Sequence, residues 1–530
     1  MRQRTFLAVV TVGAAVLGTV VGMDVREASA LAPNSRGAPD YSGTARQRKE
    51  LFEGLLRDTL AWEAFSPRKN KTLELDFAVQ AEELRRAFLK ADKELLLYNV
   101  LLHFSNLRCN HALRPRLLDD GLRLDRDHQE LPVRFGVGEG SGSDFRLFIR
   151  DHDVDIRRKL NTISPRITSV EAGDVLVDIN GSEVPDVLAG MQPFLSYSTT
   201  RQLWSEFARC LSLKRHDLGH RMFKKDVTFG LQKANGKGYR LRVSFIDETH
   251  TIDWAVNWDR HHYSGFERAL QTPSFDVYLP SGGVAAEALI VEGREFTDDT
   301  GEDVDKLRTW AVAQGVLHYN VVFDLSAARG SVVPWTLLQT LVDQPVLVTQ
   351  ATLRLSDVTP SLISRLLRSA SPALKTWLVD VVRPAQERGV DMVGPVPYGM
   401  VLPPDTEGIL DPAEVHFTGG RSALIAASSS PAVNHLAAMW VDNGLGASHG
   451  VAPFGCANAW QWRAPISLPR SDRPLVDFLW NVGHVIRPNG EVLEGNPPQP
   501  TDPVPVTAGN FQSWHSKLVD QALRGFTKEK

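Results

Sequence analysis

The C-terminal half of the chain alternates buried-strand patterns with amphipathic helix patterns. Apolar strand segments at residues 288–291 and 319–324 are followed by helical spacing at residues 304–314 and 333–342. Residues 423–439 then read as a buried strand, a serine-rich corner and an amphipathic helix. Because strands that alternate with helices along a chain build layered sheets covered by helices, this half of the sequence predicts an α/β core.

The serine-rich corner consists of Ser428, Ser429 and Ser430, followed by Pro431. A hydroxyl at such a corner lies beside the unpaired N–H groups of the first helical turn, which can stabilise an oxyanion, so a nucleophile fits there. Serine is equally a common N-cap, and proline suits the first helical position. The local pattern alone leaves both interpretations open.

The N-terminus has the form of a signal peptide over residues 1–30. A basic start precedes an apolar run, and the run ends at Ala28-Ser29-Ala30, which has the small-x-small form of a cleavage site. We therefore expect a secreted or periplasmic protein cleaved near Ala30. No later segment is apolar enough over sufficient length to cross a bilayer, so we expect no integral membrane span after signal removal.

Composition indicates an ordinary globular chain. The 59 basic and 63 acidic residues give a formal charge of −4 without a basic stripe, so we expect no nucleic-acid partner. The cysteines are too few for a disulfide scaffold, and buried thiols are expected at Cys109, Cys210 and Cys456. About 500 residues after the signal exceed what one core usually serves, so two or three domains are expected.

Changes in pattern along the chain predict its domain boundaries. A small, polar stretch with proline and glycine marks a linker at residues 31–45, and three- and four-residue apolar spacing marks an N-terminal helical region at 46–118. Short strands separated by turns indicate a β-rich module at 119–250. A connector at 251–283 then leads to the α/β core at 284–526.

Four motifs, in this order, resemble the tail-specific (carboxyl-terminal processing) and tricorn-core family of serine peptidases over most of the mature chain. The first is the helix end at Leu107 followed by His111, and the second is a PDZ-like pattern in which Gly173-Asp174 precedes a strand and an Asn180-Gly181 turn. The third is the strand and loop from Asp324 to Gly330, and the fourth is the closing Glu494 with Pro500 and Asp502. The resemblance implies an α/β core of the tail-specific protease (crotonase-like ββα) type, with an N-terminal helical region and a PDZ-like module.

The resemblance also implies a set of catalytic roles. Ser430 is the nucleophile, with Ser429 as second choice, His111 is the base, Glu494 belongs to the catalytic network and Gly330 supplies an oxyanion amide. These roles make the chain a serine endopeptidase that binds polypeptide substrates through the PDZ-like module. The family mechanism requires no metal and no organic cofactor, and the sequence does not specify an oligomeric state.

Several residues depart from the family pattern. Pro431 occupies the aligned nucleophile column and has no N–H to offer an oxyanion, while Cys456 replaces the lysine base of processing peptidases. Ser326, Ala328 and Ser331 replace the arginine, asparagine and second glycine of the oxyanion loop. The alternative function is therefore a catalytically degenerate relative that binds peptides or a partner protein without cutting them.

Three further patterns have ordinary structural interpretations. Gly446-x-Ser448-x-Gly450 matches the hydrolase elbow in letters, but the following segment is not helical, so a glycine-rich loop is expected. His216 and His220 have metal-like spacing without an evident third ligand and are expected at the surface. Residues 136–142 lack the glycine spacing of a dinucleotide fingerprint, and a flexible loop is expected there.

Overall fold

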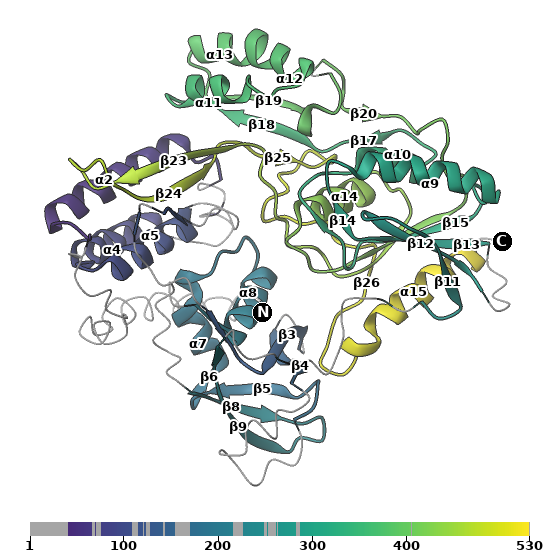
Figure 1. Ribbon diagram of the computed structural model, residues 1–530, viewed down its shortest axis with the longest axis horizontal. Coiled ribbons are helices and arrows are strands. Elements are labelled where there is room, and N and C mark those ends of the chain that lie inside the picture. The colour runs from purple at the N-terminus through teal and green to yellow at the C-terminus, as the bar shows by residue number, and fades with distance from the viewer. Residues whose placement is uncertain are drawn as a thin grey trace, which may run out of the picture.

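The computed structural model describes most of the chain after residue 40 (Figure 1). The described residues are 41–65, 69, 76–108, 115–119, 121–122, 128–140, 144–153, 170–215, 226–247, 252, 261, 263–281, 287–403 and 405–528. The expected signal peptide and most of the expected linker lie outside this range. Within it, we find no helix that combines the length and the apolarity needed to cross a membrane.

The N-terminal region is helical, as predicted. Its helices are α2 (Ala45–Trp62), α4 (Phe77–Lys90) and α5 (Glu94–Arg108). A reciprocal capping box starts α2: the hydroxyl of Thr44 accepts from the Gln47 N–H at 3.2 Å, and the Gln47 side chain accepts from the Thr44 N–H at 3.0 Å. The apolar faces meet around an edge-to-face pair, Phe52 and Phe104, with ring centroids 6.1 Å apart.

A hairpin from the far end of the chain completes this helical core. Strands β23 (Gln461–Ser467) and β24 (Pro474–Asn481) lie beside α2 and α5 (Figure 1), and β1 (Arg116–Leu117) pairs with β24. The Trp480 indole N–H donates to the hydroxyl of Thr59 at 3.0 Å. The N-terminal region therefore shares one hydrophobic core with a segment more than 350 residues later in sequence.

The β-rich module has a sheet in the order β3-β4-β5-β8-β9, with β6 paired to β5. The Asn180-Gly181 turn predicted between two strands is present, and both residues have positive φ, 53° and 84°. The elements are β3 (Val133–Glu139), β4 (Phe145–His152), β5 (Val175–Ile179), β6 (Ser182–Glu183), α7 (Val184–Met191), η2 (Gln192–Phe194), α8 (Thr200–Ser212), β8 (Asp226–Gln232) and β9 (Gly238–Ser244), beside a small sheet of β2 (His128–Glu130), β7 (Leu213–Arg215) and β10 (Ile246–Asp247).

The prediction of a flexible loop at residues 136–142 is wrong for the first part of this segment. Gly136 and Gly138 lie inside β3, paired with β4. A Cβ on Gly136 would come within 2.8 Å of the Phe148 ring, and one on Gly138 would come within 3.1 Å of the Thr507 backbone. These glycines therefore serve close packing across the strand.

The core sheet has the order β11-β12-β13-β15-β21-β22-β26 among the described strands. Strands β13 to β26 run parallel, and β11 and β12 join antiparallel at one edge. The expected connector at 251–283 thus contributes strands to this sheet. The strands are β11 (Phe266–Gln271), β12 (Phe275–Pro280), β13 (Ala288–Gly293), β15 (Asn320–Asp324), β21 (Arg421–Ile425), β22 (Ala447–Gly450) and β26 (Asp502–Pro503).

Helices cover both faces of this sheet (Figure 1). One face packs against α9 (Thr300–Gln314), α10 (Trp335–Leu341) and α14 (Pro431–Asp442). The other face presents Ile290, Val322 and Leu424 to the C-terminal helix α15 (Phe511–Lys528). Because parallel strands end at one edge, the residues after β13, β15 and β21 gather there, which is where ligands bind in sheets of this kind.

A smaller layer lies between the core and the N-terminal region. Its strand β18 pairs with β19 and β25, and its helices follow β18 in sequence (Figure 1). The elements of this layer and the remaining short strands are β14 (Glu295–Phe296), β16 (Arg329–Gly330), β17 (Val346–Leu347), β18 (Gln350–Arg354), α11 (Thr359–Leu366), α12 (Pro372–Trp377), η3 (Leu378–Val382), α13 (Arg383–Glu387), β19 (Met392–Pro397), η4 (Tyr398–Met400), β20 (Ile409–Leu410) and β25 (Val485–Ile486).

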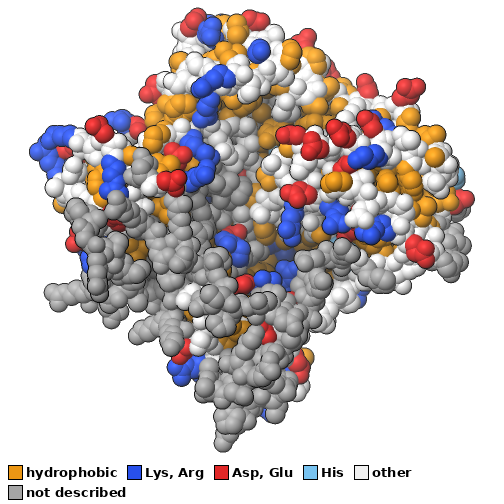
Figure 2. Space-filling view, viewed as in Figure 1, with side chains coloured by type: hydrophobic (Ala, Val, Ile, Leu, Met, Phe, Trp, Pro, Cys, Tyr) orange, Lys and Arg blue, Asp and Glu red, His pale blue; other side chains and the backbone are white. Residues whose placement is uncertain are grey.

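Charged side chains of both signs are mixed on the face of the molecule seen in Figure 2. On the face shown in Figure 2, lysine and arginine side chains alternate with aspartate and glutamate over the described residues. This distribution matches the near balance of basic and acidic residues in the sequence.

Candidate active site

The serine-rich corner lies where β21 passes into α14, at the carboxyl edge of the parallel strands. Ser430 is the N-cap of α14: its backbone is extended, and its Oγ accepts from the Val433 N–H at a long 3.5 Å. The same Oγ donates to the carbonyl oxygen of Gly330 at 2.8 Å. Capping and contact with the predicted oxyanion residue therefore occur at one hydroxyl.

Gly330 lies in the short strand β16, beside β14. Its φ is +124°, and a Cβ there would lie 2.3 Å from the Phe296 carbonyl oxygen. Only glycine fits this position without displacing the β14 backbone. The structure thus brings together two predicted site residues, Ser430 and Gly330, that are 100 positions apart in sequence.

The other corner residues differ in exposure. Ser429 is exposed, and the Ser428 hydroxyl accepts from the Ser430 N–H at 3.1 Å. Pro431 occupies the first position of α14, as its fixed φ favours. Because proline lacks an N–H, the residue after Ser430 contributes no donor to an oxyanion at Ser430 Oγ.

Asn434, which the sequence analysis missed, joins this corner to the loop at residues 455–456. Its side-chain N–H groups donate to the carbonyls of Ser428 at 3.1 Å and Ser430 at 2.7 Å. Its oxygen accepts from the N–H groups of Gly455 at 2.7 Å and Cys456 at 3.0 Å. The available sequence signal was an asparagine four residues after Ser430 inside a mostly apolar helix.

Glu494 is buried at the next step of this network. One carboxylate oxygen accepts from the Ala457 N–H at 2.7 Å, and the other accepts from the hydroxyl of Ser198. Ser198 precedes α8 in the β-rich module, so Glu494 ties that module to the core. The solvated carboxylate that a lone glutamate would suggest is therefore absent at this position, where only 1% of the residue is exposed.

Cys456 lies between the two networks and is fully buried. Burial raises the pKa of its thiol well above the ordinary value, and the charge of Glu494 raises this pKa further. A neutral thiol cannot act as the ammonium base that lysine supplies in processing peptidases. The burial expected from the sequence is confirmed for the thiols of Cys456 and Cys210, and Cys109 lies outside the described residues.

The remaining predicted histidines cannot be placed. His111, the base implied by the resemblance, lies outside the described residues, as do His216 and His220. Among the described residues, the candidate site therefore consists of Ser430, Gly330, Asn434 and the pair formed by Glu494 and Ser198.

The second serine motif forms part of the sheet. Ser448 lies in β22 and is fully buried, and its Oγ accepts from the Thr501 N–H at 3.0 Å. The prediction of a glycine-rich loop is wrong here, because the strand β22 pairs in parallel with β21 and β26. A strand residue bonded inside the sheet lacks the strand-to-helix turn that a nucleophile elbow needs.

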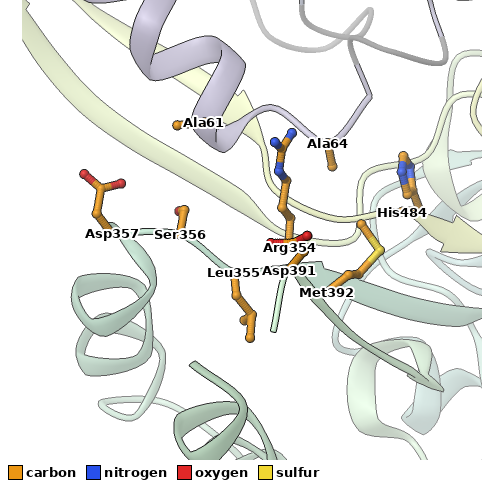
Figure 3. A pocket seen from close by; sticks show the side chains of 9 residues that line it. All are labelled: Ala61, Ala64, Arg354, Leu355, Ser356, Asp357, Asp391, Met392 and His484. Atoms are coloured by element: carbon orange, nitrogen blue, oxygen red, sulfur yellow. The ribbon is translucent and has the colours of Figure 1, made fainter. Parts of the chain in front are cut away.

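A cavity of about 670 Å³ lies apart from these residues, between α2 and the β18–β19 layer (Figure 3). Arg354 projects from β18 toward α2 and donates to the carbonyls of Glu63 at 2.6 Å and Leu60 at 2.9 Å. The cavity is lined by Ala61, Ala64, Arg354, Leu355, Ser356, Asp357, Asp391, Met392 and His484, and by none of the predicted site residues.

Comparison with known proteins gives matches in structure and none in sequence. No family model matches the chain, and no curated protein does. Mature CPAF matches with a TM-score of 0.65 at 14% identity, over 91% of this chain and 98% of that one. Mature CPAF complexed with lactacystin matches with a TM-score of 0.63 at 14% identity, over 90% and 98%.

A third structure, the photosystem II D1 C-terminal processing protease, matches at 15% identity over 86% of this chain and 93% of that one, with a TM-score of 0.39. The CPAF matches cover almost the whole of both chains, so they include the helical region, the β-rich module and the core. The chain therefore has the fold of CPAF, and the resemblance to the tail-specific (S41) serine peptidases predicted from its sequence is confirmed at the level of the fold.

Proposed function

We propose that the chain is an exported serine endopeptidase that uses Ser430 as its nucleophile. The observation that carries this proposal is the hydrogen-bonded path from Ser430 through Asn434 and the 455–457 backbone to the buried pair Glu494 and Ser198. A buried polar network whose hydrogen bonds are satisfied holds its side chains rigidly, whereas an unpaired polar group in it would cost free energy. Such a network fits a site that must keep a nucleophile and a distant carboxylate in register.

In the proposed reaction, Ser430 Oγ attacks the carbonyl carbon of the scissile peptide bond. His111 takes the hydroxyl proton and returns it to the leaving amine, which gives an acyl-enzyme that water then hydrolyses. Glu494, through Ser198, orients the base. The Gly330 N–H donates to the developing oxyanion. For Ser430 Oγ to attack, its hydrogen bond to the Gly330 carbonyl must break when substrate binds.

The missing donor at Pro431 predicts a slow enzyme. Removing one oxyanion donor typically costs roughly a hundred- to a thousandfold in kcat. Because the hydroxyl that would attack also caps α14, substrate binding must compete with a structural role of the same group.

We propose that the β-rich module acts as the PDZ-like substrate clamp. An extended peptide would add to an edge strand of its sheet, which gives affinity through main-chain hydrogen bonds. The Glu139 N–H at the end of edge strand β3 donates to the Val506 carbonyl at 2.7 Å, so this edge already meets the segment that leads into α15. Export follows from the signal-like first 30 residues.

A second candidate function is peptide or protein binding without hydrolysis. The capping bonds of Ser430, the proline that follows it and the buried neutral thiol of Cys456 all favour this function. Both functions share the fold and the clamp, and they differ only in whether Ser430 is activated.

Reaction with a fluorophosphonate probe, which labels activated serines, separates the two functions. We expect labelling of the mature protein at Ser430, loss of labelling in Ser430→Ala, and retention in the matched exposed variant Ser429→Ala. Hydrolysis of a generic protein substrate should follow the same order. Absence of labelling in well-folded protein would select the binding function.

A further inference from the structure

A second polar cluster lies under α15, at the carboxyl edge of the core sheet. Asp324 ends β15, His515 lies in α15, and His261 precedes β11. The three residues are far apart in sequence, so no local motif announces them. In sequence, Asp324 belongs to the motif of the oxyanion loop, and neither histidine lies in a motif.

The geometry of the cluster is compact. Asp324 is completely buried, and one of its oxygens bonds His515 Nε2 at 2.5 Å and the Tyr263 hydroxyl at 2.8 Å. The His261 ring stacks on the His515 ring with centroids 3.5 Å apart and planes inclined by 12°. One nitrogen or oxygen atom from each of His261, Asp324 and His515 lies within 4.8 Å of the other two.

The charges around the cluster favour a cation. Glu292 on β13 is the register partner of Asp324 on β15, so a second buried carboxylate lies at the same edge, where the Tyr278 hydroxyl donates to it at 2.8 Å. Ser326 Oγ lies 3.2 Å from His261 Nε2, so the loop after β15 also contacts this ring. Imidazole coordinates metal ions through a ring nitrogen.

We propose that His261, Asp324 and His515 bind a divalent transition-metal ion of the Zn²⁺ class. Two imidazoles and one carboxylate are a ligand set that such ions accept, with a fourth position left for water or a further ligand. The Tyr263 hydroxyl and the Ser326 N–H, which donates to the other Asp324 oxygen at 2.8 Å, would orient the carboxylate from outside.

Seating the ion requires the stacked rings of His261 and His515 to turn, so that the in-plane nitrogen lone pair of each points at the same ion. Two ligand atoms of a tetrahedral zinc ion lie about 3.3 Å apart, given metal–ligand distances near 2.0–2.1 Å. The His515 nitrogen would therefore move by less than about 1 Å from the Asp324 oxygen. His515 and His261 are half-buried, which gives an ion a path to the site from solvent.

The ion would join three distant segments: the chain before β11, the end of β15 and helix α15. Because it would bind the folded chain and have no assembled site in the unfolded one, it should stabilise the fold. This role is independent of any hydrolysis at Ser430.

The test uses the full mature chain, stripped with chelator and titrated with Co²⁺, whose visible absorption reports protein ligation, and with Zn²⁺ in competition. We expect one Co²⁺ per chain and a higher melting temperature with Zn²⁺. Two variants, His261→Gln and His515→Gln, should each weaken Co²⁺ binding more than roughly 100-fold, since losing even an outer partner typically costs roughly 10–100-fold.

His318→Gln is the control, because His318 is an exposed histidine of the same core outside the cluster. It should bind Co²⁺ as the parent does. Failure of the parent chain to bind either metal would overturn the proposal. Undiminished binding in both cluster variants would overturn it as well, because the ion would then use other ligands. Neither result bears on labelling of Ser430.

Discussion

Replacing Asn434 with alanine tests whether the network behind Ser430 is a structural support. The side chain is fully buried and makes four hydrogen bonds. The carbonyls of Ser428 and Ser430 keep other partners, since they also accept from the N–H groups of Phe454 and Asn434. The loss therefore falls on the donors of Gly455 and Cys456.

Each buried donor left without a partner costs about 1–3 kcal/mol, so Asn434→Ala should lower the free energy of unfolding by about 2–6 kcal/mol. At about 2–4 °C per kcal/mol for a domain of this size, the melting temperature should fall by at least about 4 °C. Scanning calorimetry at a fixed scan rate measures the shift.

The matched control is Asn489→Ala. Asn489 is exposed and bonds Asp442 and Glu491, so water replaces its lost bonds and the change should stay within about 0.5 kcal/mol. If Asn434→Ala melts within about 1 °C of this control, the four bonds do not carry the energy assigned to them, and the inference of a rigid support behind Ser430 fails.

Three further predictions concern single residues. Burial lowers the pKa of His435 from 6.5 to about 3, so between pH 7 and pH 5 only the unfolded chain takes the proton. The free energy of unfolding should therefore fall by about 2 kcal/mol over this range. His435→Gln should flatten this part of the stability profile, and an unchanged slope would contradict the assignment. Glu494→Gln removes the charge but fits the same space: the amide oxygen can accept from the Ala457 N–H while the amide NH2 donates to Ser198 Oγ, so kcat should fall by roughly 100-fold or more with little change in melting temperature. Unchanged turnover would remove Glu494 from the mechanism. Iodoacetamide should leave Cys210 and Cys456 unmodified in the native protein and alkylate both after denaturation, as peptide mapping would show, and early reaction of Cys456 would be inconsistent with its burial and raised pKa.

The elements of the core were predictable because burial leaves a period in the sequence. The strand and helix expected at 319–324 and 304–314 appear as β15 and α9, within a few residues at each end. The corner before α14 was predictable for the same reason, since an apolar run gives way to serines and a proline at the first helical position. The local pattern could not decide between cap and nucleophile, and the structure shows that Ser430 caps α14 and also contacts Gly330.

Long-range partners were beyond the reach of the sequence. Asn434 reads as an ordinary helical residue until the 455–456 loop lies against it, and Ser198 gains a role only where its module meets Glu494. The hairpin of β23 and β24 joins the N-terminal helices, although the sequence pattern assigned it to the core.

The sequence by itself determined the alternation of strands and helices in the core and the turn at Asn180-Gly181, because each depends on local spacing. The family resemblance pointed to Ser430 and Gly330 as candidate site residues, and the structure places these two in contact. The tertiary structure alone decided which carboxylates are buried, how Asn434 satisfies two loop N–H groups and why His261, Asp324 and His515 meet. These contacts join residues from separate strands and helices, and only packing of the sheet against its helices fixes their distances.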